Sequence, residues 1–474
     1  MADLFGRIRF GVTAEPVSCA DGDTTVTWDP GRQTVTLVRD RLGERPLFYA
    51  PTSDGVLYSS TQDALLAHVA PVLDLDGLHR ALAFTLNVPG VPWSGVHEVA
   101  PGTSVTVTPS GATTTTYWRL TAREHTDDLG TTVATIRDLL GAALEDAPAA
   151  SLLSGGLDSS LLAALAGVST TYEVDFPEYR ERFVPTEERA APDGPFAAEV
   201  AAHLGTAHHT LTLDAATLAD PALRRRVVQA YGTPPGWGDR DRSAYLLYRA
   251  VREKTVLSGE GADELFGGYA TFFDPAAQDA TTFPWVVTYY DDYGPAPGAL
   301  RPALDLPGHL ADEYARAVAE VEDPTRIVAH LFLTRALPVL LARKNSLSGA
   351  AGLDVRTPFT DPRLVEYVYN VPWSMKTFDG REKSLLRAIA RDLLPRSVLT
   401  RVKTAYPSTC DPAYLAALGR EAARLVSLDH PVFEIADRTW LGEADPARPR
   451  DRNTVEWILN LAAWLDVYHP TLAL

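Results

Sequence analysis

The chain has 474 residues, 46% of them hydrophobic and 22% charged, a size and composition that predict two domains with buried cores and exclude a mainly disordered protein. Its net charge of −18 argues against nucleic acid as a partner, and the lack of a long apolar run or a signal-peptide core argues against a membrane. Two cysteines, Cys19 and Cys410, are too few for a disulfide framework and favour a cytoplasmic protein.

Alternating apolar and polar residues mark the first part of the chain as β-rich. The segments 24–28, 33–38 and 103–108 show this period of two, which indicates strands with one buried face. Turn-forming residues separate them, so the predicted sheet is antiparallel. A polar stretch at 121–128 marks a domain boundary.

The second part alternates apolar strands with helices and is therefore predicted to be an α/β domain with a parallel sheet flanked by helices. The chain is expected to be mostly helical after about residue 310. Segment 291–307 has many turn formers and no periodicity, which predicts a mobile loop or lid. The elements expected around the sheet are strands at 151–153, 171–176 and 255–257 and helices from Ser159 and near 196–204.

A Ser- and Gly-rich loop lies between the first of these strands and the first helix. Glycines let the backbone approach a ligand closely, while hydroxyls and the free N–H groups of a helix start bind anions. The loop therefore predicts a phosphate site, with a simple helix cap as the alternative. It lacks the lysine of a Walker A loop and carries an aspartate instead. The candidate residues are Leu153, Ser154, Gly155, Gly156, Asp158, Ser159 and Ser160.

Two motifs carry a family resemblance. Residues 154–159, Ser-Gly-Gly-Leu-Asp-Ser, resemble the pyrophosphate loop of the ATP-pyrophosphatase superfamily, and residues 257–269 resemble the matching stretch of asparagine synthetases. The resemblance spans residues 130–470 well and 35–115 weakly. It implies an ATP-dependent carbon–nitrogen ligase that forms AMP and pyrophosphate.

The resemblance also implies roles for four charged residues. Asp158 and Asp263 match the family's metal-binding carboxylates and would hold Mg²⁺, which prefers oxygen ligands. Lys383 and Lys403 match lysines that contact the pyrophosphate and the transition state. Lys403 lies in a loop, 401–407, that is expected to close over the site.

Further residues are expected around the nucleotide and the nucleophile. Val174 would lie near adenine, and Ser258 and Gly259 would contact the nucleotide. At the position of Glu260, asparagine synthetases have a glutamate near the intermediate and the incoming ammonia. In β-lactam synthetases the position resembles a tyrosine that deprotonates the amine. We assign Glu260 to the nucleophile, as a proton acceptor or a positioning group, with a role as a partner of Lys403 as the alternative.

The amino-terminal half of the resemblance is incomplete. Glutamine-dependent family members begin with a cysteine nucleophile, whereas this sequence has Ala2, and Cys19 cannot replace an N-terminal nucleophile. Residues 39–49 resemble a stretch of the glutaminase domain but lie far earlier in the chain than that stretch does in the family. We expect a truncated, inactive glutaminase-like domain at 1–122 and an asparagine-synthetase-like domain at 123–474.

The sequence thus predicts a synthetase that joins a small-molecule or peptide carboxylate to ammonia or an amine in specialised metabolism. Asn345 and Ser346 replace an acidic and a basic residue of the family, so a substrate other than aspartate is expected if this segment lines the acyl pocket. The alternatives are a lasso-type macrolactam cyclase and a β-lactam-forming synthetase. A tRNA-modifying enzyme and an inactive ATP-binding scaffold are disfavoured, and a homodimer is left open.

Overall fold

The amino-terminal part is a sandwich of two antiparallel sheets in the computed structural model, which describes residues 4–11, 17–181, 183, 185 and 189–473. One sheet has the order β1-β6-β5-β8 and the other β10-β9-β4-β3-β2. The strands are β1 (Phe5–Arg9), β2 (Val17–Asp21), β3 (Thr24–Asp29), β4 (Thr34–Val38), β5 (Phe48–Thr52), β6 (Gly55–Ser59), β8 (His97–Glu98), β9 (Thr103–Thr108) and β10 (Gly111–Thr116).

Alternation along the strands explains the core of the sandwich. In β3, Val26 and Trp28 are buried while Thr27 is exposed, and in β9 Val105 and Val107 are buried. Side chains of successive residues point to opposite faces of a strand, so one face of each sheet is apolar and packs against the other sheet. The three strands predicted at 24–28, 33–38 and 103–108 are confirmed.

A five-stranded parallel sheet organises the larger part of the molecule, in the order β13-β12-β11-β14-β15. Helices α4 (Leu157–Ala166) and α6 (Gly194–Leu204) pack on one face, and α9 (Asp239–Ala250) and α15 (Leu337–Ala351) on the other. This confirms the predicted α/β class. The strands are β11 (Ala150–Leu152), β12 (Thr170–Asp175), β13 (Ala207–Thr212), β14 (Thr255–Leu257) and β15 (Asp354–Arg356).

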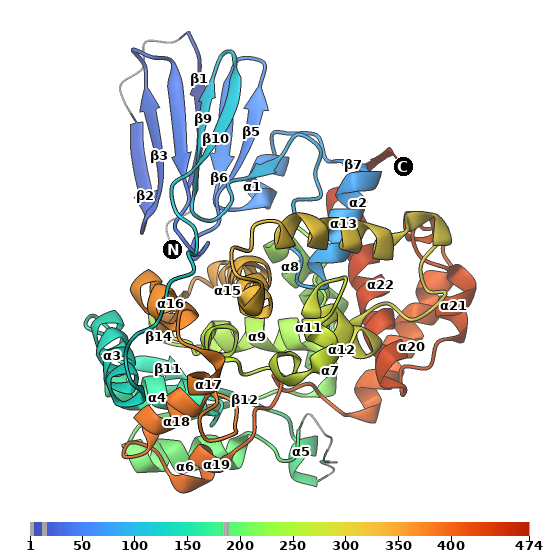
Figure 1. Ribbon diagram of the computed structural model, residues 1–474. Coiled ribbons are helices and arrows are strands. Elements are labelled where there is room, and N and C mark those ends of the chain that lie inside the picture. The colour runs from blue at the N-terminus through green and yellow to red at the C-terminus, as the bar shows by residue number, and fades with distance from the viewer. Residues whose placement is uncertain (1–3, 12–16, 182, 184, 186–188, 474) are drawn as a thin grey trace.

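The rest of the larger part is mainly helical, as predicted (Figure 1). The run 324–351 is apolar and long enough to cross a membrane, but 56% of its most apolar stretch is buried inside the protein, as in the core helix of a folded domain. The main helices are α3 (Leu129–Ala143), α8 (Pro221–Tyr231), α10 (Ala262–Phe266), α12 (Pro284–Tyr293), α13 (Leu306–Val318), α14 (Ile327–Leu331), α16 (Pro362–Tyr369), α18 (Ser384–Ala390), α20 (Pro412–Val426) and α22 (Pro449–Tyr468).

Segment 291–307 differs from the mobile loop that was predicted. Its two ends belong to α12 and α13, and its middle is held by tertiary hydrogen bonds. The N–H of Ala296 donates to Oγ1 of Thr454 at 2.9 Å, and the N–H of Arg301 donates to the carbonyl of Ile435 at 3.0 Å. The amino-acid composition of the segment does not indicate hydrogen bonds to residues so distant in the sequence.

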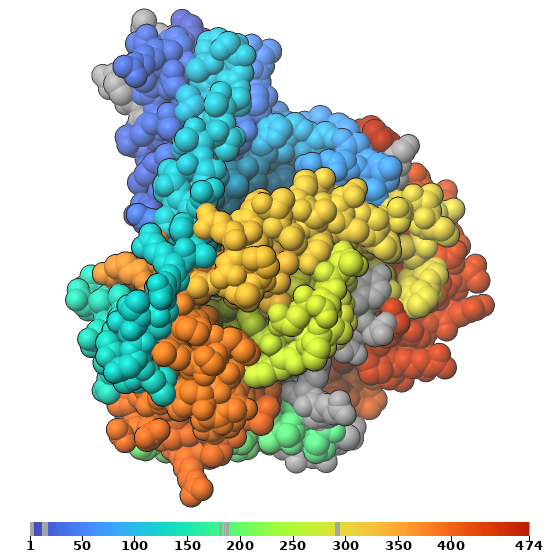
Figure 2. All heavy atoms as spheres, in the orientation of Figure 1, coloured from blue at the N-terminus to red at the C-terminus, as the bar shows by residue number. Residues whose placement is uncertain are grey.

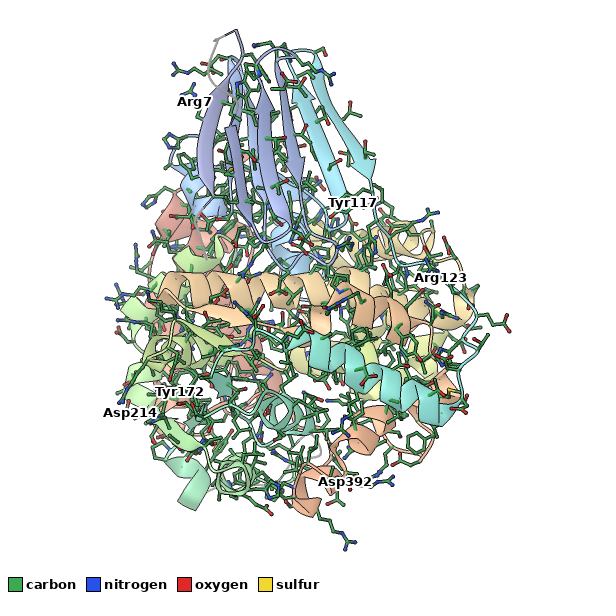
Figure 3. The ribbon with its side chains drawn as sticks, turned by 90° about the vertical axis from the view of Figure 1, so that its left-hand side faces the viewer. Arg7, Tyr117, Arg123, Tyr172, Asp214 and Asp392 are labelled. Atoms are coloured by element: carbon green, nitrogen blue, oxygen red, sulfur yellow. The ribbon has the colours of Figure 1, made fainter. Side chains whose placement is uncertain are left out.

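The sandwich projects from the larger part but is not separate from it (Figure 2). Figure 3 shows Tyr117 at the base of the sandwich and Arg123 on the larger part, so the linker between them crosses from one to the other. Strand β7 (Val72–Asp74) and helix α2 (Leu75–Phe84), although amino-terminal in sequence, pack into the core of the larger part. There β7 pairs in parallel with β16 (Thr471–Ala473).

Candidate active site

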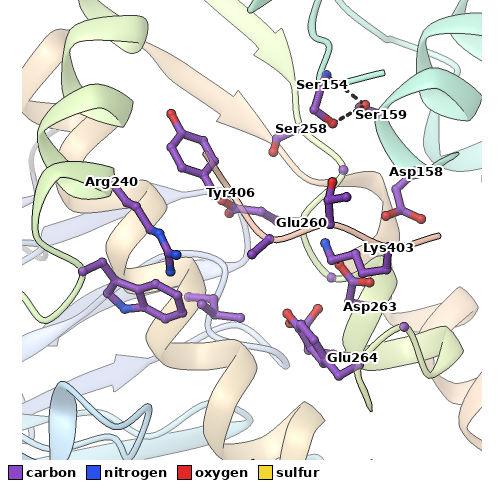
Figure 4. A pocket seen from close by; sticks show the side chains of 18 of the residues that line it. Ser154, Asp158, Ser159, Arg240, Ser258, Glu260, Asp263, Glu264, Lys403 and Tyr406 are labelled. Carbon is purple, nitrogen blue, oxygen red and sulfur yellow. Dashed lines mark hydrogen bonds and ion pairs between the residues drawn. The ribbon is translucent and has the colours of Figure 1, made fainter. Parts of the chain in front are cut away.

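A cavity of about 920 Å³ opens at the carboxyl ends of β11, β12 and β14, where parallel sheets bind ligands. Figure 4 shows side chains of 18 of the residues that line it and labels ten of them. Lys383 and Gly156 line a small adjoining cavity of about 50 Å³. The candidate residues that line the main cavity are Leu153, Ser154, Asp158, Ser159, Val174, Ser258, Gly259, Glu260, Asp263 and Lys403.

The phosphate loop is shaped by its two glycines. Gly155 has a φ of +65°, and a Cβ there would lie 2.4 Å from the backbone nitrogen of Ala197. The hydroxyls of Ser154 and Ser159 lie 3.1 Å apart, and that of Ser159 also accepts the N–H of Ser154 at 3.2 Å. Helix α4 follows Gly156, and no side chain in the described part of the chain caps its first N–H groups. These N–H groups can therefore receive an anion.

Ser160 differs from its neighbours in the loop. Its side chain is fully buried, and its hydroxyl has no hydrogen-bond partner among the described residues. It therefore lies behind the loop rather than on the cavity surface.

Four charged side chains meet beside the loop although they come from distant parts of the sequence. Nζ of Lys383 lies 2.5 Å from Oδ2 of Asp158 and 2.6 Å from Oδ1 of Asp263. Nζ of Lys403 lies 2.6 Å from Oδ2 of Asp263. The two lysines and two aspartates therefore form a single chain of ion pairs at the edge of the cavity.

Lys383 is the most constrained member of this cluster. Its side chain is 3% exposed, and its backbone has a φ of +53°, a left-handed conformation that is uncommon for a residue with a Cβ. Such strained positions persist where the surrounding structure holds them, and they concentrate at functional sites. Burial lowers the pKa of Lys383, but Asp158 and Asp263 overcome this and raise it, so the side chain remains an ammonium.

The two aspartates have opposite pKa shifts. Burial raises the pKa of Asp158 more than the nearby Lys383 lowers it. Burial also acts to raise the pKa of Asp263, but Lys383 and Lys403 together lower it. The two lysines thus favour the ionised form of Asp263, while burial disfavours the ionised form of Asp158.

The donor set of this cluster fits Mg²⁺. Two carboxylates that reach one ammonium nitrogen are close enough to hold one cation between them. The described residues contain no group of three or more metal-binding side chains. Mg²⁺ commonly uses one or two carboxylates and completes its shell with phosphate oxygens and water.

Glu260 lies near the middle of the cavity as drawn in Figure 4. Its Oε2 has no hydrogen-bond partner in the described part of the structure. Burial raises its pKa, Arg343 and Lys344 act against this rise, and Glu44 adds to it. The expected alternative, a pairing of Glu260 with Lys403, does not match the geometry, because Lys403 pairs with Asp263.

Glu44 reaches this region from the loop between β4 and β5 of the sandwich. Its Oε1 accepts Nζ of the fully buried Lys344 at 2.7 Å, and its Oε2 accepts the hydroxyls of Thr357 at 2.6 Å and Thr360 at 3.0 Å. Asn345 donates to the carbonyl of Glu44 at 2.5 Å. Asn345 therefore contacts the sandwich, and it is Arg343 that lines the cavity.

Three contributors to the site were not predicted from the sequence. Arg401 donates to the carbonyl of Ser154 at 3.1 Å and so ties the loop of Lys403 to the phosphate loop. Glu264 is buried next to Asp263 and accepts the hydroxyl of Tyr269 at 2.5 Å. The sequence signal for Arg401 was its position two residues before Lys403. Glu264 and Tyr269 belong to the motif 257–269, but the motif does not indicate the direction of their side chains.

A glycine-containing loop at the start of α4, two paired carboxylates, the buried Lys383 and the partly exposed Lys403 lie together at the carboxyl edge of a parallel sheet. This arrangement is typical of nucleotide-dependent enzymes of the α/β class. Residues 135–466 match the asparagine synthase family model, and residues 14–118 match that of the glutamine amidotransferase domain. The chain therefore belongs to the asparagine synthetase family, whose members are ATP-dependent ligases that form carbon–nitrogen bonds.

Similar proteins include asparagine synthetase [glutamine-hydrolyzing] 3 of Bacillus subtilis (strain 168), which is 32% identical over 82% of this chain and 67% of its own length. Asparagine synthetase [glutamine-hydrolyzing] 1 of the same organism is 24% identical over 80% of this chain and 66% of its own length. Asparagine synthetase B [glutamine-hydrolyzing] of Escherichia coli (strain K12) is 28% identical over 60% and 45%. The chain thus spans two thirds or less of the length of these relatives.

Proposed function

We propose that this chain is an AMP-forming amide synthetase that activates a carboxylate with ATP and transfers the acyl group to ammonia or an amine. The supporting observation is the ion-pair cluster of Asp158, Asp263, Lys383 and Lys403 at the mouth of the phosphate loop, with Glu260 in the same cavity. In such a reaction, negative charge develops on phosphate oxygens and the nitrogen nucleophile loses a proton. The lysines of the cluster can stabilise the charge, and Glu260 can accept the proton.

In the first step, a carboxylate oxygen of the substrate attacks the α-phosphorus of ATP, and the bond from that phosphorus to the bridging oxygen breaks. Pyrophosphate leaves, and the acyl group remains bonded to AMP. The N–H groups at the start of α4 and the ammonium groups of Lys383 and Lys403 would stabilise the charge on the leaving pyrophosphate. Mg²⁺ held by Asp158 and Asp263 would supply further neutralisation of phosphate charge.

In the second step, nitrogen attacks the acyl carbon, the bond from carbon to the AMP oxygen breaks, and AMP leaves. The nitrogen must lose a proton, and Glu260 is the carboxylate we assign to accept it. Its raised pKa suits this task, because a base works best when its pKa lies close to the working pH.

The nitrogen donor is proposed to be ammonia or an amine rather than glutamine. Cys410 lacks the environment of an activated nucleophile. Sγ of Cys19 contacts the hydroxyl of Tyr58 at 3.6 Å in the sandwich, and burial, with Glu178, raises the pKa of the Cys410 thiol. A reactive cysteine needs a lowered pKa. Release of glutamate from glutamine by this chain, in step with ATP use, would contradict the proposal.

The central test is the identity of the nucleotide product. The chain is incubated with ATP, Mg²⁺, ammonium and a panel of carboxylic acids, and the products are separated by chromatography. We expect AMP and pyrophosphate in amounts equal to the amide formed. ADP and phosphate as products would overturn the proposed chemistry.

A further inference from the structure

The part of the cavity away from the phosphate loop is lined mainly by aromatic rings. It lies between α9, the segment 269–289 and the helical run 324–351. The cavity as a whole, at about 920 Å³, is near the upper end of the range for small-molecule sites and has room for ATP together with a second sizeable molecule. The rings that line the cavity include those of Trp237, Tyr269, Phe273, Trp285, Phe332 and Tyr406.

Several of these rings are fixed by contacts with one another. Tyr269 stacks on Phe332 with ring centres 5.1 Å apart. Trp285 also contacts Phe332, with ring centres 5.0 Å apart. The indole N–H of Trp285 donates to the carbonyl of Leu86 at 2.8 Å, which satisfies its only polar atom. Tyr269 also lies 6.0 Å from Nζ of Lys403, so the aromatic wall begins directly beside the charged cluster.

The helical run supplies the second wall through an irregular turn. Residues Phe332–Ala336 form a π-helical segment between α14 and α15, and such segments are frequent at functional sites. One continuous face of the helical run lines the cavity through the π-helical turn, with the side chains of Phe332, Ala336, Leu340 and Arg343. Ala336 leaves space there that a larger side chain would fill.

Two arginines line this region of the cavity. Nε of Arg343 lies 2.7 Å from Oδ1 of Asp241, and its guanidinium lies 5.7 Å from the ring centre of Trp237 and 5.6 Å from that of Tyr406. Arg240 lines the cavity on the side away from Asp158 (Figure 4). The carboxylate of Glu260 also lines the cavity and is assigned to the nitrogen nucleophile, so the rest of this wall offers a bound substrate mainly apolar contact.

We infer that the acyl substrate is a carboxylic acid with a bulky aromatic body. This inference rests on the proposed function, because it assigns the carboxylate of the substrate to the charged end of the cavity. The rings would cover the apolar body, and burial of such area supplies binding energy that a four-carbon dicarboxylate cannot provide. Arg240 would meet a hydrogen-bond acceptor at the distal end of the molecule.

The experiment compares three probes, 2-naphthylacetate, 3-phenylpropionate and aspartate, in ATP–pyrophosphate exchange and in calorimetric binding with a non-hydrolysable ATP analogue present. We expect 2-naphthylacetate to bind at least tenfold more tightly than aspartate and to give the greater exchange, with 3-phenylpropionate between them. Preference for aspartate would overturn the inference while leaving AMP formation intact. Formation of ADP with any probe would instead remove the proposed function.

Two variants localise the effect. Ala336→Leu narrows the cavity, and Ala350→Leu places the same side chain on the exposed end of α15 as a matched control. We expect Ala336→Leu to weaken 2-naphthylacetate binding at least tenfold with unchanged affinity for the ATP analogue, and Ala350→Leu to change neither. Phe273→Ser, at a ring that is 46% exposed, serves as a second variant because its loss costs little folding energy. Unchanged naphthylacetate binding in both Ala336→Leu and Phe273→Ser would refute the inference.

Discussion

The two ends of the cavity differ in the kind of group that faces the ligand. At the phosphate end, ammonium and carboxylate groups lie within 2.6 Å of one another. At the far end, rings contact rings, and Arg343 is already paired with Asp241. Charged groups lower the energy of charge that appears during a reaction, whereas apolar walls distinguish ligands by shape and area. Substitutions at the phosphate end should therefore act on kcat, and those at the far end on KM.

The largest effect is expected from Lys383→Met. Removal of this buried ammonium leaves Asp158 and Asp263 close together, and loss of one partner of a buried charge group typically costs about 3–5 kcal/mol. We expect a lower Tm, near-complete loss of turnover, and partial recovery of Tm on addition of Mg²⁺ without ATP. Thermal unfolding with and without Mg²⁺ measures this.

The matched control is Lys376→Met. Lys376 is also buried, but its Nζ donates to the carbonyl of Leu265 at 3.0 Å and no carboxylate pairs with it in the described structure. Its Tm should not respond to Mg²⁺. An equal response of both variants would show that Mg²⁺ does not bind between Asp158 and Asp263.

Glu260→Gln should separate the two steps of the reaction. Glutamine keeps the size of the side chain but cannot accept a proton, and loss of a general base commonly lowers the rate by roughly 10²–10⁴-fold. We expect amide formation to fall in this range while ATP–pyrophosphate exchange changes little. In the unchanged protein, amide formation should rise with pH through the raised pKa of Glu260, because only the ionised form accepts a proton. Equal loss of both activities would assign Glu260 to binding instead.

Lys403→Ala is expected to lower kcat with little change in ATP affinity. Its side chain is one third exposed and lies in a loop, so it contributes less to the resting structure than Lys383 does. A contact realised mainly in the transition state is worth roughly 10²–10³ in rate. Single-turnover rates and ATP titrations on the same preparations test this, with the exposed Lys254→Ala as control. A normal single-turnover rate in Lys403→Ala would show that this lysine takes no part in the reaction.

The smallest effect concerns the pH dependence of stability at Glu264. Burial, with Asp263 nearby, raises its pKa to about 7 from an ordinary value of 4.5. The folded state then binds more protons than the unfolded state between these values, so stability is present below pH 4.5 and is lost as pH rises to about 7. Glu264→Gln should flatten the Tm profile across this window. A profile parallel to that of the unchanged protein would contradict the shift.

Sequence reasoning succeeded where neighbours in the chain make the structure. The period of two in β3 and β9 predicted strands correctly, because a strand depends on a local pattern. The phosphate-binding role of residues 153–160 stays a prediction. The pairing of Lys383 with Asp158 joins positions 225 residues apart, so its geometry depends on packing that the sequence does not display. Only the family resemblance pointed to these lysines.

The aromatic end of the cavity was not predicted for a related reason. Its rings come from four distant segments, and the direction of Phe332 and Ala336 depends on one π-helical turn. A regular helical period assigns such side chains to the wrong face. Segment 291–307 shows the reverse error, since its composition indicates a loop while distant hydrogen bonds hold it in place.

Glu44 gives the sandwich an influence over a proton acceptor that lies in another part of the chain. Its negative charge raises the pKa of Glu260 directly. It also forms an ion pair with Lys344, and the positive charge of Lys344 lowers the pKa of Glu260. If the sandwich shifts away, both contributions change in the same direction and Glu260 titrates at lower pH. The position of the sandwich thus helps to set the pH at which Glu260 accepts a proton, although Glu44 does not line the cavity.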